Sequence, residues 1–257
     1  MTRKQIERYL ERIGLSQPIT LDLAGLTQLQ RAHQSVIPFE NLDIMTGFSL
    51  SLDRTRLYEK MIIDRRGGIC SELNTLYNWL LESLGFDVVS FNSRIIAKNA
   101  MIQPRTHRVL CVQLGEERYL TDVGFNYEHH RDPLLLKEGL VQSDGCCNYR
   151  LEKDEFWGWV MWQERPGMGW RQILGFTEER QIDADFILPT FYAQYHPDSR
   201  INKFLKISLY DKEQPICYAI RSGYFYIEKN GVEQVAELIT SQEHSRKLLR
   251  EQFGLMR

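Results

Sequence analysis

The stretch "RRGGICSELNTLY" (residues 65–77) places a pair of glycines just before a cysteine. From Cys70 to Leu84 apolar residues recur at helical spacing and Gly85 follows, which predicts an amphipathic helix that begins at the cysteine. The unpaired N–H groups and the positive dipole end of such a helix favour an anion. Gly67 and Gly68 can adopt positive φ and leave room for a substrate carbonyl to approach. The stretch therefore suits a nucleophilic thiolate, although by itself it also fits an ordinary loop.

The composition is that of an ordinary soluble globular protein. The 257 residues are 43% hydrophobic and 26% charged, and the net charge of −2 provides no field that attracts nucleic acid or an anionic membrane. The charged start "MTRKQIERYLERIG" is unlike a signal peptide, and no run of about 18 apolar residues suits a membrane span. The five cysteines lack a zinc-binding spacing, which predicts reduced thiols, no metal and a cytoplasmic location.

Helical signals dominate the first third of the chain. Residues 2–13 form a predicted helix with a capping box at Thr2 and Gln5. Further helices are expected over residues 23–37 and 53–63, ahead of the helix that begins at the cysteine. Together these segments predict an N-terminal helical bundle.

Strand patterns replace the helical ones in the middle third. Period-2 alternation predicts strands over residues 86–96, 106–114, 118–125, 156–163 and 170–176. A run of strands joined by short turns indicates an antiparallel sheet or barrel.

The last third mixes both kinds of element. A short helix over residues 198–205, strands over 216–220 and 223–229, and a final helix with a capping box at Thr240 and Glu243 are expected. The predicted fold class is therefore α+β. We expect a helical bundle over 1–85 that carries the cysteine, a β-barrel over 86–187 that carries its partners, and an α/β segment over 188–257.

His107 and Asp122 are the best-placed partners for the cysteine. They lie on two predicted strands joined by "GEE" (115–117). If the turn consists of Gly115 and Glu116 alone, the two residues project from one face as diagonal neighbours within side-chain reach. Asp122 would then fix the imidazole tautomer, and His107 would take the thiol proton. A three-residue turn would place them on opposite faces as unrelated residues.

These segments resemble those of a known family. "RGGICSELN" around Cys70 is similar to the active-site signature of the arylamine N-acetyltransferases. "THRVL" at His107 and "YLTDVGF" at Asp122 resemble the family's other two catalytic segments, in the same order. Further similar segments are "YLERIG" (9–14), "IPFENLDI" (37–44) and "HPDSR" (196–200). The resemblance thus extends from the first helix into the last third of the chain.

The resemblance implies a fold and a reaction. It implies a papain- and transglutaminase-like core with a helical bundle, a β-barrel and a C-terminal α/β lid. The implied chemistry is ping-pong: acetyl-CoA acetylates Cys70, CoA leaves, and an arylamine, hydrazine or N-hydroxyarylamine takes the acetyl group. His107 and Asp122 complete the implied triad. Acetyl-CoA is the expected co-substrate, without nucleic acid or membrane as partner, and the choice between monomer and homo-oligomer stays open.

Substrate or CoA contacts are implied for residues in or beside the family segments: Phe39, Arg105, Thr106, Gly124, Phe125 and Asn126. Asn126 stands where family members generally carry glycine, and its side chain puts acceptor size and CoA approach in question. Phe125 is expected to form an aromatic wall for the acceptor.

A second group of residues is expected to support the Cys70 loop. Glu40 and Arg66 are interpreted as an internal ion pair with Arg12 as a possible third member, and Gly67 and Gly68 are placed in the same supporting group. Loss of one partner of a buried pair would cost roughly 3–5 kcal/mol. We expect this group to act in support rather than in catalysis.

Other signals are interpreted as structural. His129 and His130 are expected in a solvated loop rather than at a metal, and Cys111 in the core. Alternative functions are a thiol peptidase or transglutaminase with the same triad, which would need an extended peptide cleft. A macrolactam-forming amide synthase, or a catalytically weak member that acts as a binding module, also stays open.

Overall fold

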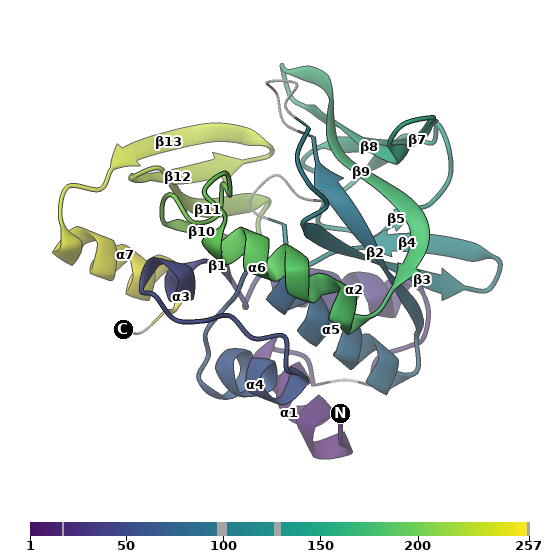
Figure 1. Cartoon of the computed structure of the whole chain (residues 1–257), viewed down its shortest axis with the longest axis horizontal. Helices are drawn as coiled ribbons and strands as arrows, with labels where there is room; N and C mark the ends of the chain where they lie inside the picture. The colour runs from purple at the N-terminus through teal and green to yellow at the C-terminus, as the bar shows by residue number, and fades with distance from the viewer. Residues whose placement is uncertain (17, 97–101, 126–129, 256–257) are drawn as a thin grey trace.

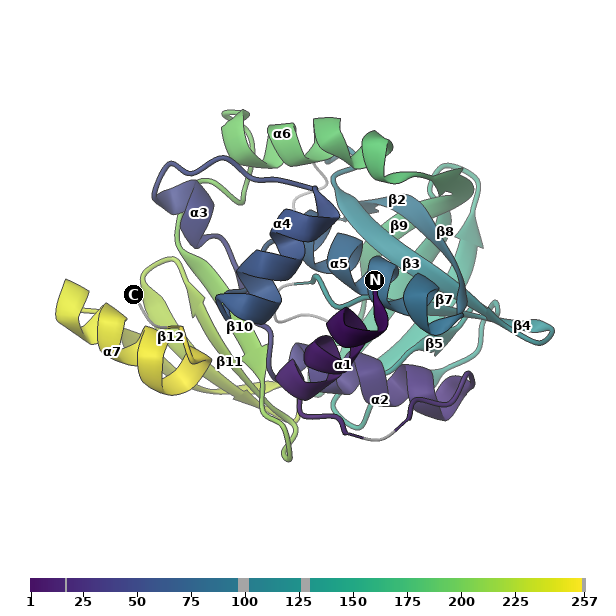
Figure 2. The same cartoon turned by 90° about the horizontal axis from the view of Figure 1, so that it is seen from below.

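The computed structural model describes residues 1–16, 18–96, 102–125 and 130–255. The central helix α5 (Cys70–Leu84) lies between an eight-stranded sheet and a five-stranded sheet (Figures 1 and 2). The two termini lie at the ends of different layers, because α1 packs beneath α5 while α7 packs on the five-stranded sheet. The mixed architecture confirms the predicted α+β class.

The N-terminal helices pack around α5. They are α1 (Arg3–Arg12), α2 (Leu23–Gln34), α3 (Leu42–Met45), α4 (Arg54–Tyr58), which continues into the π-turn η1 (Glu59–Ile63), and α5 (Cys70–Leu84). The predicted capping box of α1 is present, with Gln5 N–H donating to Thr2 Oγ1 and Thr2 N–H donating to Gln5 Oε1. Gly85 caps the C-terminus of α5, and its φ of +103° lies in the left-handed region that favours glycine at this position.

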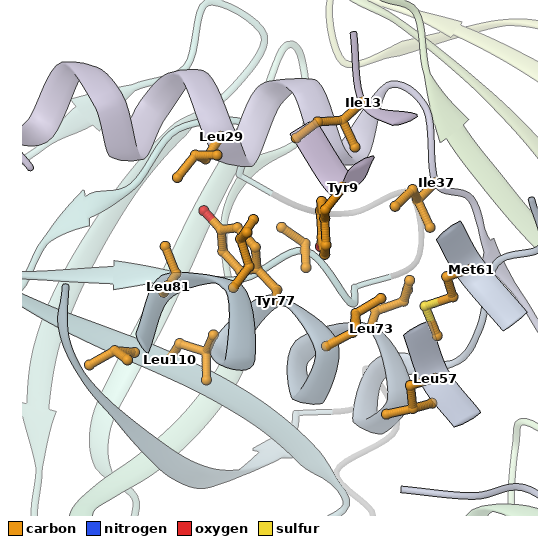
Figure 3. Close-up of a cluster of buried hydrophobic side chains, with 14 of the residues drawn as sticks. Tyr9, Ile13, Leu29, Ile37, Leu57, Met61, Leu73, Tyr77, Leu81 and Leu110 are labelled. Carbon is orange, nitrogen blue, oxygen red and sulfur yellow. The ribbon is translucent and has the colours of Figure 1, made fainter. Parts of the chain in front are cut away.

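Figure 3 shows the core that these helices share. Tyr9 of α1, Leu29 of α2, Met61 of η1 and Leu73 and Tyr77 of α5 point into one apolar cluster. α5 is more deeply buried than an amphipathic helix, because its polar side is also covered. The buried polar residues of this helix are Ser71, Glu72, Asn74, Thr75 and Asn78. Each buried polar group needs a partner, so this side of α5 should form specific hydrogen bonds.

The eight-stranded sheet is antiparallel, with the order β5-β4-β3-β2-β9-β8-β7-β6. Its strands are β2 (Asp87–Ile95), β3 (His107–Leu114), β4 (Glu117–Thr121), β5 (Leu134–Leu135), β6 (Gln142–Ser143), β7 (Asn148–Asp154), β8 (Gly158–Arg165) and β9 (Gly169–Gln181). The side-chain amide of Gln142 exchanges hydrogen bonds of 2.7 and 3.0 Å with the backbone of Leu135, which links the two edge strands. The sheet is therefore a nearly closed barrel, as predicted.

The five-stranded sheet joins one strand from the first third of the chain to four strands from the last third. Its order is β1-β10-β11-β12-β13, with β1 (Phe39–Glu40), β10 (Lys206–Tyr210), β11 (Ile216–Arg221), β12 (Tyr224–Lys229) and β13 (Val232–Leu238). Helix α7 (Gln242–Phe253) packs Leu248, Leu249 and Phe253 against this sheet. The division of the chain after residues 85 and 187 stays a prediction.

Two predictions for the last third are wrong. Residues 198–205 form no helix, and the helix of this region is α6 (Ile187–Tyr195), preceded by the short 3₁₀ helix η2 (Asp183–Phe186). α6 carries exposed apolar side chains and so lacks a polar face that would mark it in the sequence, while Pro197 prevents its continuation. The N-cap of α7 is Ser241 rather than Thr240, because the Ser241 hydroxyl accepts from His244 N–H.

Among the described residues, no helix is long and apolar enough to cross a membrane.

Candidate active site

Cys70 is the first residue of α5, and its side chain is largely enclosed. Ile69 before it is extended, with φ −84° and ψ 173°, and donates its N–H to Glu72 Oε2 over 3.0 Å. Cys70 retains 8% exposure, and its Sγ lies 3.8 Å from the Thr106 carbonyl oxygen. The thiol therefore sits at the positive end of the helix dipole, next to the start of β3.

The β3–β4 hairpin has the two-residue turn that the triad requires. Leu114 pairs with Glu117 and Leu110 with Thr121, so the turn consists of Gly115 and Glu116. Gly115 alone of these two has positive φ, at +61°, as a Gly-first type II′ turn demands.

This register brings His107 and Asp122 to one face. His107 Nε2 lies 2.6 Å from Asp122 Oδ2, and both residues are buried. Because Nε2 is engaged by Asp122, Nδ1 is the imidazole nitrogen available to Cys70.

The charge of His107 is set by its two neighbours. Burial by itself lowers the pKa of His107, but Asp122 and then Cys70 outweigh burial and raise that pKa to about 10. An imidazolium at neutral pH can stabilise a thiolate as an ion pair. The arrangement can therefore hold the proton on histidine and leave the sulfur nucleophilic.

Asn74 holds the carboxylate in place, and the sequence analysis did not find it. Its Nδ2 donates to Asp122 Oδ1 over 2.7 Å and to the Arg108 carbonyl over 2.7 Å, while its Oδ1 accepts from Val123 N–H over 3.0 Å. Asn74 lies one helical turn after Cys70 and is fully buried. A polar residue at this spacing from the nucleophile was the available signal.

Two further groups fix the Asp122 segment. Gly124 N–H donates to Asp122 Oδ1 over 2.8 Å, and Gln34 Nε2 of α2 donates to the Asp122 carbonyl over 3.0 Å. A Cβ on Gly124 would lie 2.7 Å from Cys70 Cα and 2.7 Å from Asn74 Nδ2. Glycine is therefore required here by close packing.

The glycines before Cys70 are needed for close packing. Neither Gly67 nor Gly68 adopts the positive φ that glycine allows. A Cβ on Gly67 would lie 2.0 Å from the Pro38 carbonyl oxygen, and one on Gly68 2.7 Å from Met61 Cε and 2.8 Å from Glu72 Oε2. The glycines therefore allow the loop to lie directly against β1 and α5 rather than provide a bend.

The expected ion pair of the loop is present without its third member. Arg66 Nη2 lies 2.7 Å from Glu40 Oε1 and 2.9 Å from Asp43 Oδ1. Arg12 instead donates to the carbonyls of Met61 and Arg65 over 3.3 and 3.4 Å. The third member of this group is therefore the acidic residue Asp43 rather than the basic residue Arg12.

The residues expected at substrate or CoA lie at different depths. Phe39 is 5% exposed and forms a parallel bridge with Gly68, which places it beneath the Cys70 loop. Thr106 presents its carbonyl to the thiol, and Arg105 lies 3.8 Å from Glu179 on β9.

Phe125 contacts the imidazole of His107. Its ring lies edge-on to His107, with centroids 4.9 Å apart. Asn126, expected next to it, lies outside the described residues, as does His129.

His130 corrects the expectation of a solvated loop. It is fully buried, its Nδ1 lies 2.7 Å from the Asp132 carbonyl oxygen, and Gln30 Nε2 donates to its carbonyl over 3.0 Å. Burial lowers the pKa of His130. Within the described part of the chain no group of His, Cys, Asp and Glu could hold a metal ion.

The other thiols differ from Cys70 in their surroundings. Cys111 is buried in the barrel, as expected, and burial raises its pKa to about 12. Cys147 and Cys217 are buried as well, and burial raises the pKa of Cys147 to about 11. Cys70 alone is joined to a histidine–aspartate pair among the described residues.

Comparisons with known proteins agree with this geometry. A family model described as N-acetyltransferase matches residues 22–256. The chain is 34% identical over 203 residues to the arylamine N-acetyltransferase of Escherichia coli K12, covering 78% of this chain and 71% of that protein. It is 33% identical over 234 residues to the arylamine N-acetyltransferase / N-hydroxyarylamine O-acetyltransferase of Salmonella typhimurium, covering 90% and 82%.

Solved structures give the same result. The arylamine N-acetyltransferase structure from Salmonella typhimurium matches with a TM-score of 0.92 at 28% identity, covering 99% of this chain and 92% of that chain. The Mycobacterium marinum enzyme in complex with CoA matches with a TM-score of 0.89 at 27% identity, covering 97% and 92%.

The fold and the matched relatives together define an acyltransferase. The chain belongs to the arylamine N-acetyltransferase family. Its family was correctly predicted from the sequence, and the enzyme class follows from it.

Proposed function

We propose that this chain transfers an acetyl group from acetyl-CoA to arylamines, arylhydrazines or N-hydroxyarylamines through a thioester on Cys70. The observation that carries the proposal is the line of contacts from Cys70 through His107 to Asp122, with 2.6 Å between His107 Nε2 and Asp122 Oδ2. The structure of one relative, the Mycobacterium marinum enzyme, has been determined in complex with CoA. The names of other relatives give arylamines and N-hydroxyarylamines as their substrates.

In the first half-reaction the Cys70 sulfur attacks the acetyl carbonyl. His107 holds the proton that the thiol has lost and delivers it to the departing CoA sulfur. The Cys70 N–H, as the first amide of α5, is suited to donate to the oxyanion of the tetrahedral intermediate. The acetyl group is then held as a thioester, and CoA leaves as the thiol.

In the second half-reaction the amine attacks the thioester carbonyl. His107 takes the proton from the amine nitrogen as the C–N bond forms, and the Cys70 sulfur leaves as the thiolate. Asp122 keeps Nδ1 of His107 directed at the sulfur throughout, because its carboxylate accepts from Nε2. The edge of Phe125 against His107 is positioned to border the acceptor. The cytoplasmic location and the oligomeric state stay predictions.

The test is intact mass spectrometry after mixing with acetyl-CoA and no amine. We expect one acetyl adduct of the parent protein, none on Cys70→Ala, and discharge of the adduct by an arylamine. Cys146→Ala, at a half-buried thiol outside the site, is the matched control and should keep the adduct. An adduct that survives in Cys70→Ala would contradict the assignment. Acylation by a carrier-bound acyl group but not by acetyl-CoA would favour the amide synthase.

A further inference from the structure

Strand β3 presents two different faces beside the site. Leu110 and Val112 belong to the apolar cluster around α5, whereas Val109 belongs to the cluster inside the barrel. Because neighbouring residues of a strand point to opposite faces, His107 lies on the barrel side of β3 and Arg108 on the side of α5. Arg108 is therefore the α5-facing residue of β3 that lies nearest to His107 in the chain.

The side chain of Arg108 joins β3 to the first turns of α5. Its Nη1 donates to Thr75 Oγ1 over 2.9 Å, and Thr75 Oγ1 in turn donates to the Ser71 carbonyl oxygen over 2.5 Å. Arg108 directly follows His107, and Ser71 directly follows Cys70. Two consecutive hydrogen bonds thus connect the backbone next to the thiol with the residue next to the imidazole.

Two further groups keep the guanidinium in this position. Ser90 Oγ of β2 accepts from its Nε and Nη2 over 3.0 and 2.7 Å, and Asp183 Oδ1 of η2 accepts from its Nη1 over 2.8 Å. Arg108 is 1% exposed, and a buried cation needs a counter-ion. Burial lowers the pKa of Arg108, and Asp183 opposes this; Arg54 of α4 and Glu82 of α5 also act on that pKa. Because arginine keeps its proton in proteins, the positive charge remains when the carboxylate is removed.

The contacts of Arg108 constrain β3 in a way that its apolar neighbours do not. Burial of Leu110 and Val112 against α5 is non-directional, so it permits small shifts of the strand. A guanidinium that donates to fixed acceptors defines both position and orientation. His107 is the first residue of β3, so the contact between its imidazole and the Cys70 thiol depends on where the strand begins.

We propose that Arg108 is a positioning residue: by fixing the start of β3 to α5, it keeps His107 in contact with Cys70. The proposal rests on the proposed function in that Cys70 is the nucleophile. Asn74 acts on the main chain of the same residue, since its Nδ2 donates to the Arg108 carbonyl oxygen over 2.7 Å. Two consecutive residues of α5, Asn74 and Thr75, therefore hold the main chain and the side chain of Arg108.

The test is the rate at which iodoacetamide alkylates Cys70, measured by intact mass from about pH 4 to pH 9. Cys146→Ala serves as the parent protein, because it lacks the half-buried thiol outside the site. Thr75→Val has nearly the same shape and removes the α5 acceptor of Arg108. We expect it to lower the rate on the acid limb about tenfold, because an imidazolium that is held less firmly stabilises the thiolate less.

Thr75→Ser is the matched control for this substitution. It retains the hydroxyl that accepts from Arg108, so its alkylation profile should coincide with that of the parent. If the Thr75→Val profile also coincides with that of the parent, the proposal is wrong.

A double variant without either charge separates positioning from stability. Asp183→Asn leaves the buried guanidinium without its carboxylate, so it should lower the midpoint of thermal unfolding. Arg108→Met/Asp183→Asn should recover most of this loss, because an apolar side chain of similar length replaces the buried ion pair. The double variant should nevertheless keep the slow acid limb of Thr75→Val, since it lacks the link to α5.

A double variant that regains both the stability and the alkylation profile of the parent would show that Arg108 has only a structural role. If the double variant stays unstable, the comparison of Thr75→Val with Thr75→Ser decides alone. Alkylation does not involve acetyl-CoA, so a failure of the proposed function is detected separately, by the absence of an acetyl adduct on the parent protein.

Discussion

Asn74 Nδ2 lies 2.7 Å from Asp122 Oδ1, which ties the helix that begins at Cys70 to the carboxylate that contacts His107. The same nitrogen donates to the Arg108 carbonyl, and the side-chain oxygen accepts from Val123 N–H. One buried amide thereby fixes α5, β3 and the end of β4 relative to each other. Because the amide is neutral, it orients Asp122 without cancelling the charge that His107 needs.

Replacing Asn74 should reduce acetylation more than it reduces stability of the fold. Asn74→Ala removes one donor to Asp122 Oδ1 and retains the hydrogen bond from Gly124 N–H, so the carboxylate is held less firmly. A lost buried hydrogen bond costs about 1–3 kcal/mol, so we expect the rate of Cys70 acetylation to fall roughly ten- to a hundredfold. Quenching the acetylation reaction at set times and measuring the acetylated fraction by intact mass gives this rate. An unchanged rate would show that Asn74 has no role in orienting Asp122.

A substitution at Gly124 tests the close packing between the Asp122 segment and Cys70. In Gly124→Ala the new methyl group would meet Cys70 Cα and the Asn74 amide at 2.7 Å, so the segment must move. We expect loss of most acetylation activity in a folded protein. Gly115→Ala is the control, because no atom lies within 4 Å of a Cβ added there. The only cost of this substitution is backbone strain, which arises from the φ of +61°. That control should be destabilised by about 1 kcal/mol and stay active.

The ion pairs of Arg66 with Glu40 and Asp43 predict unequal effects for two arginines, Arg66 and Arg12. Arg66→Met leaves Glu40 buried without its cation, which should lower the free energy of unfolding by roughly 3–5 kcal/mol. Arg12→Met removes only hydrogen bonds to two carbonyls, so about 1 kcal/mol for each is expected. Urea unfolding compares the two variants. Equal losses of unfolding free energy would show that Arg12 stabilises a buried carboxylate as Arg66 does, contrary to the contacts seen.

His33 should make stability fall in mild acid. It is fully buried with its Nδ1 2.7 Å from the Tyr9 hydroxyl, and burial, aided by Arg12, lowers its pKa to about 3. A folded-state pKa below that of the unfolded chain means that this contribution is complete above about pH 6.5 and is lost as the pH falls toward 3.

The slope from this histidine is up to about 1.4 kcal/mol per pH unit. Gln in its place can still accept from Tyr9 and does not titrate. The difference in unfolding free energy between the parent and His33→Gln should therefore shrink between pH 7.5 and pH 4.5, measured by urea unfolding. A difference independent of pH would show that His33 does not titrate across folding.

Much of the site could be predicted because it depends on local patterns. The apolar spacing predicts a helix that begins at Cys70, and Gly85 predicts its end. The structure confirms both ends of α5. The shared face of His107 and Asp122 follows from a turn of two residues, which a glycine at its first position favours. In both cases the determining interactions lie within a few residues of each other along the chain.

The unpredicted parts depend on packing between distant segments. α6 has apolar residues on its exposed side, and the periodicity of its sequence did not reveal it. Gly67 and Gly68 were correctly singled out, but their reason is the closeness of Pro38 and Glu72, which no local pattern encodes.

The sequence by itself determined the family and the two-residue turn between β3 and β4, and it predicted Cys70 with His107 and Asp122 as partners, since each of these depends on residue type and short-range spacing. Only the tertiary structure decided what covers the polar side of α5. There, Asn74 meets Asp122 and Glu72 meets Lys60, although a helical pattern shows both positions as solvent-facing. The physical reason is that a buried polar group must find its partner, and that partner lies on whichever segment the fold packs against it.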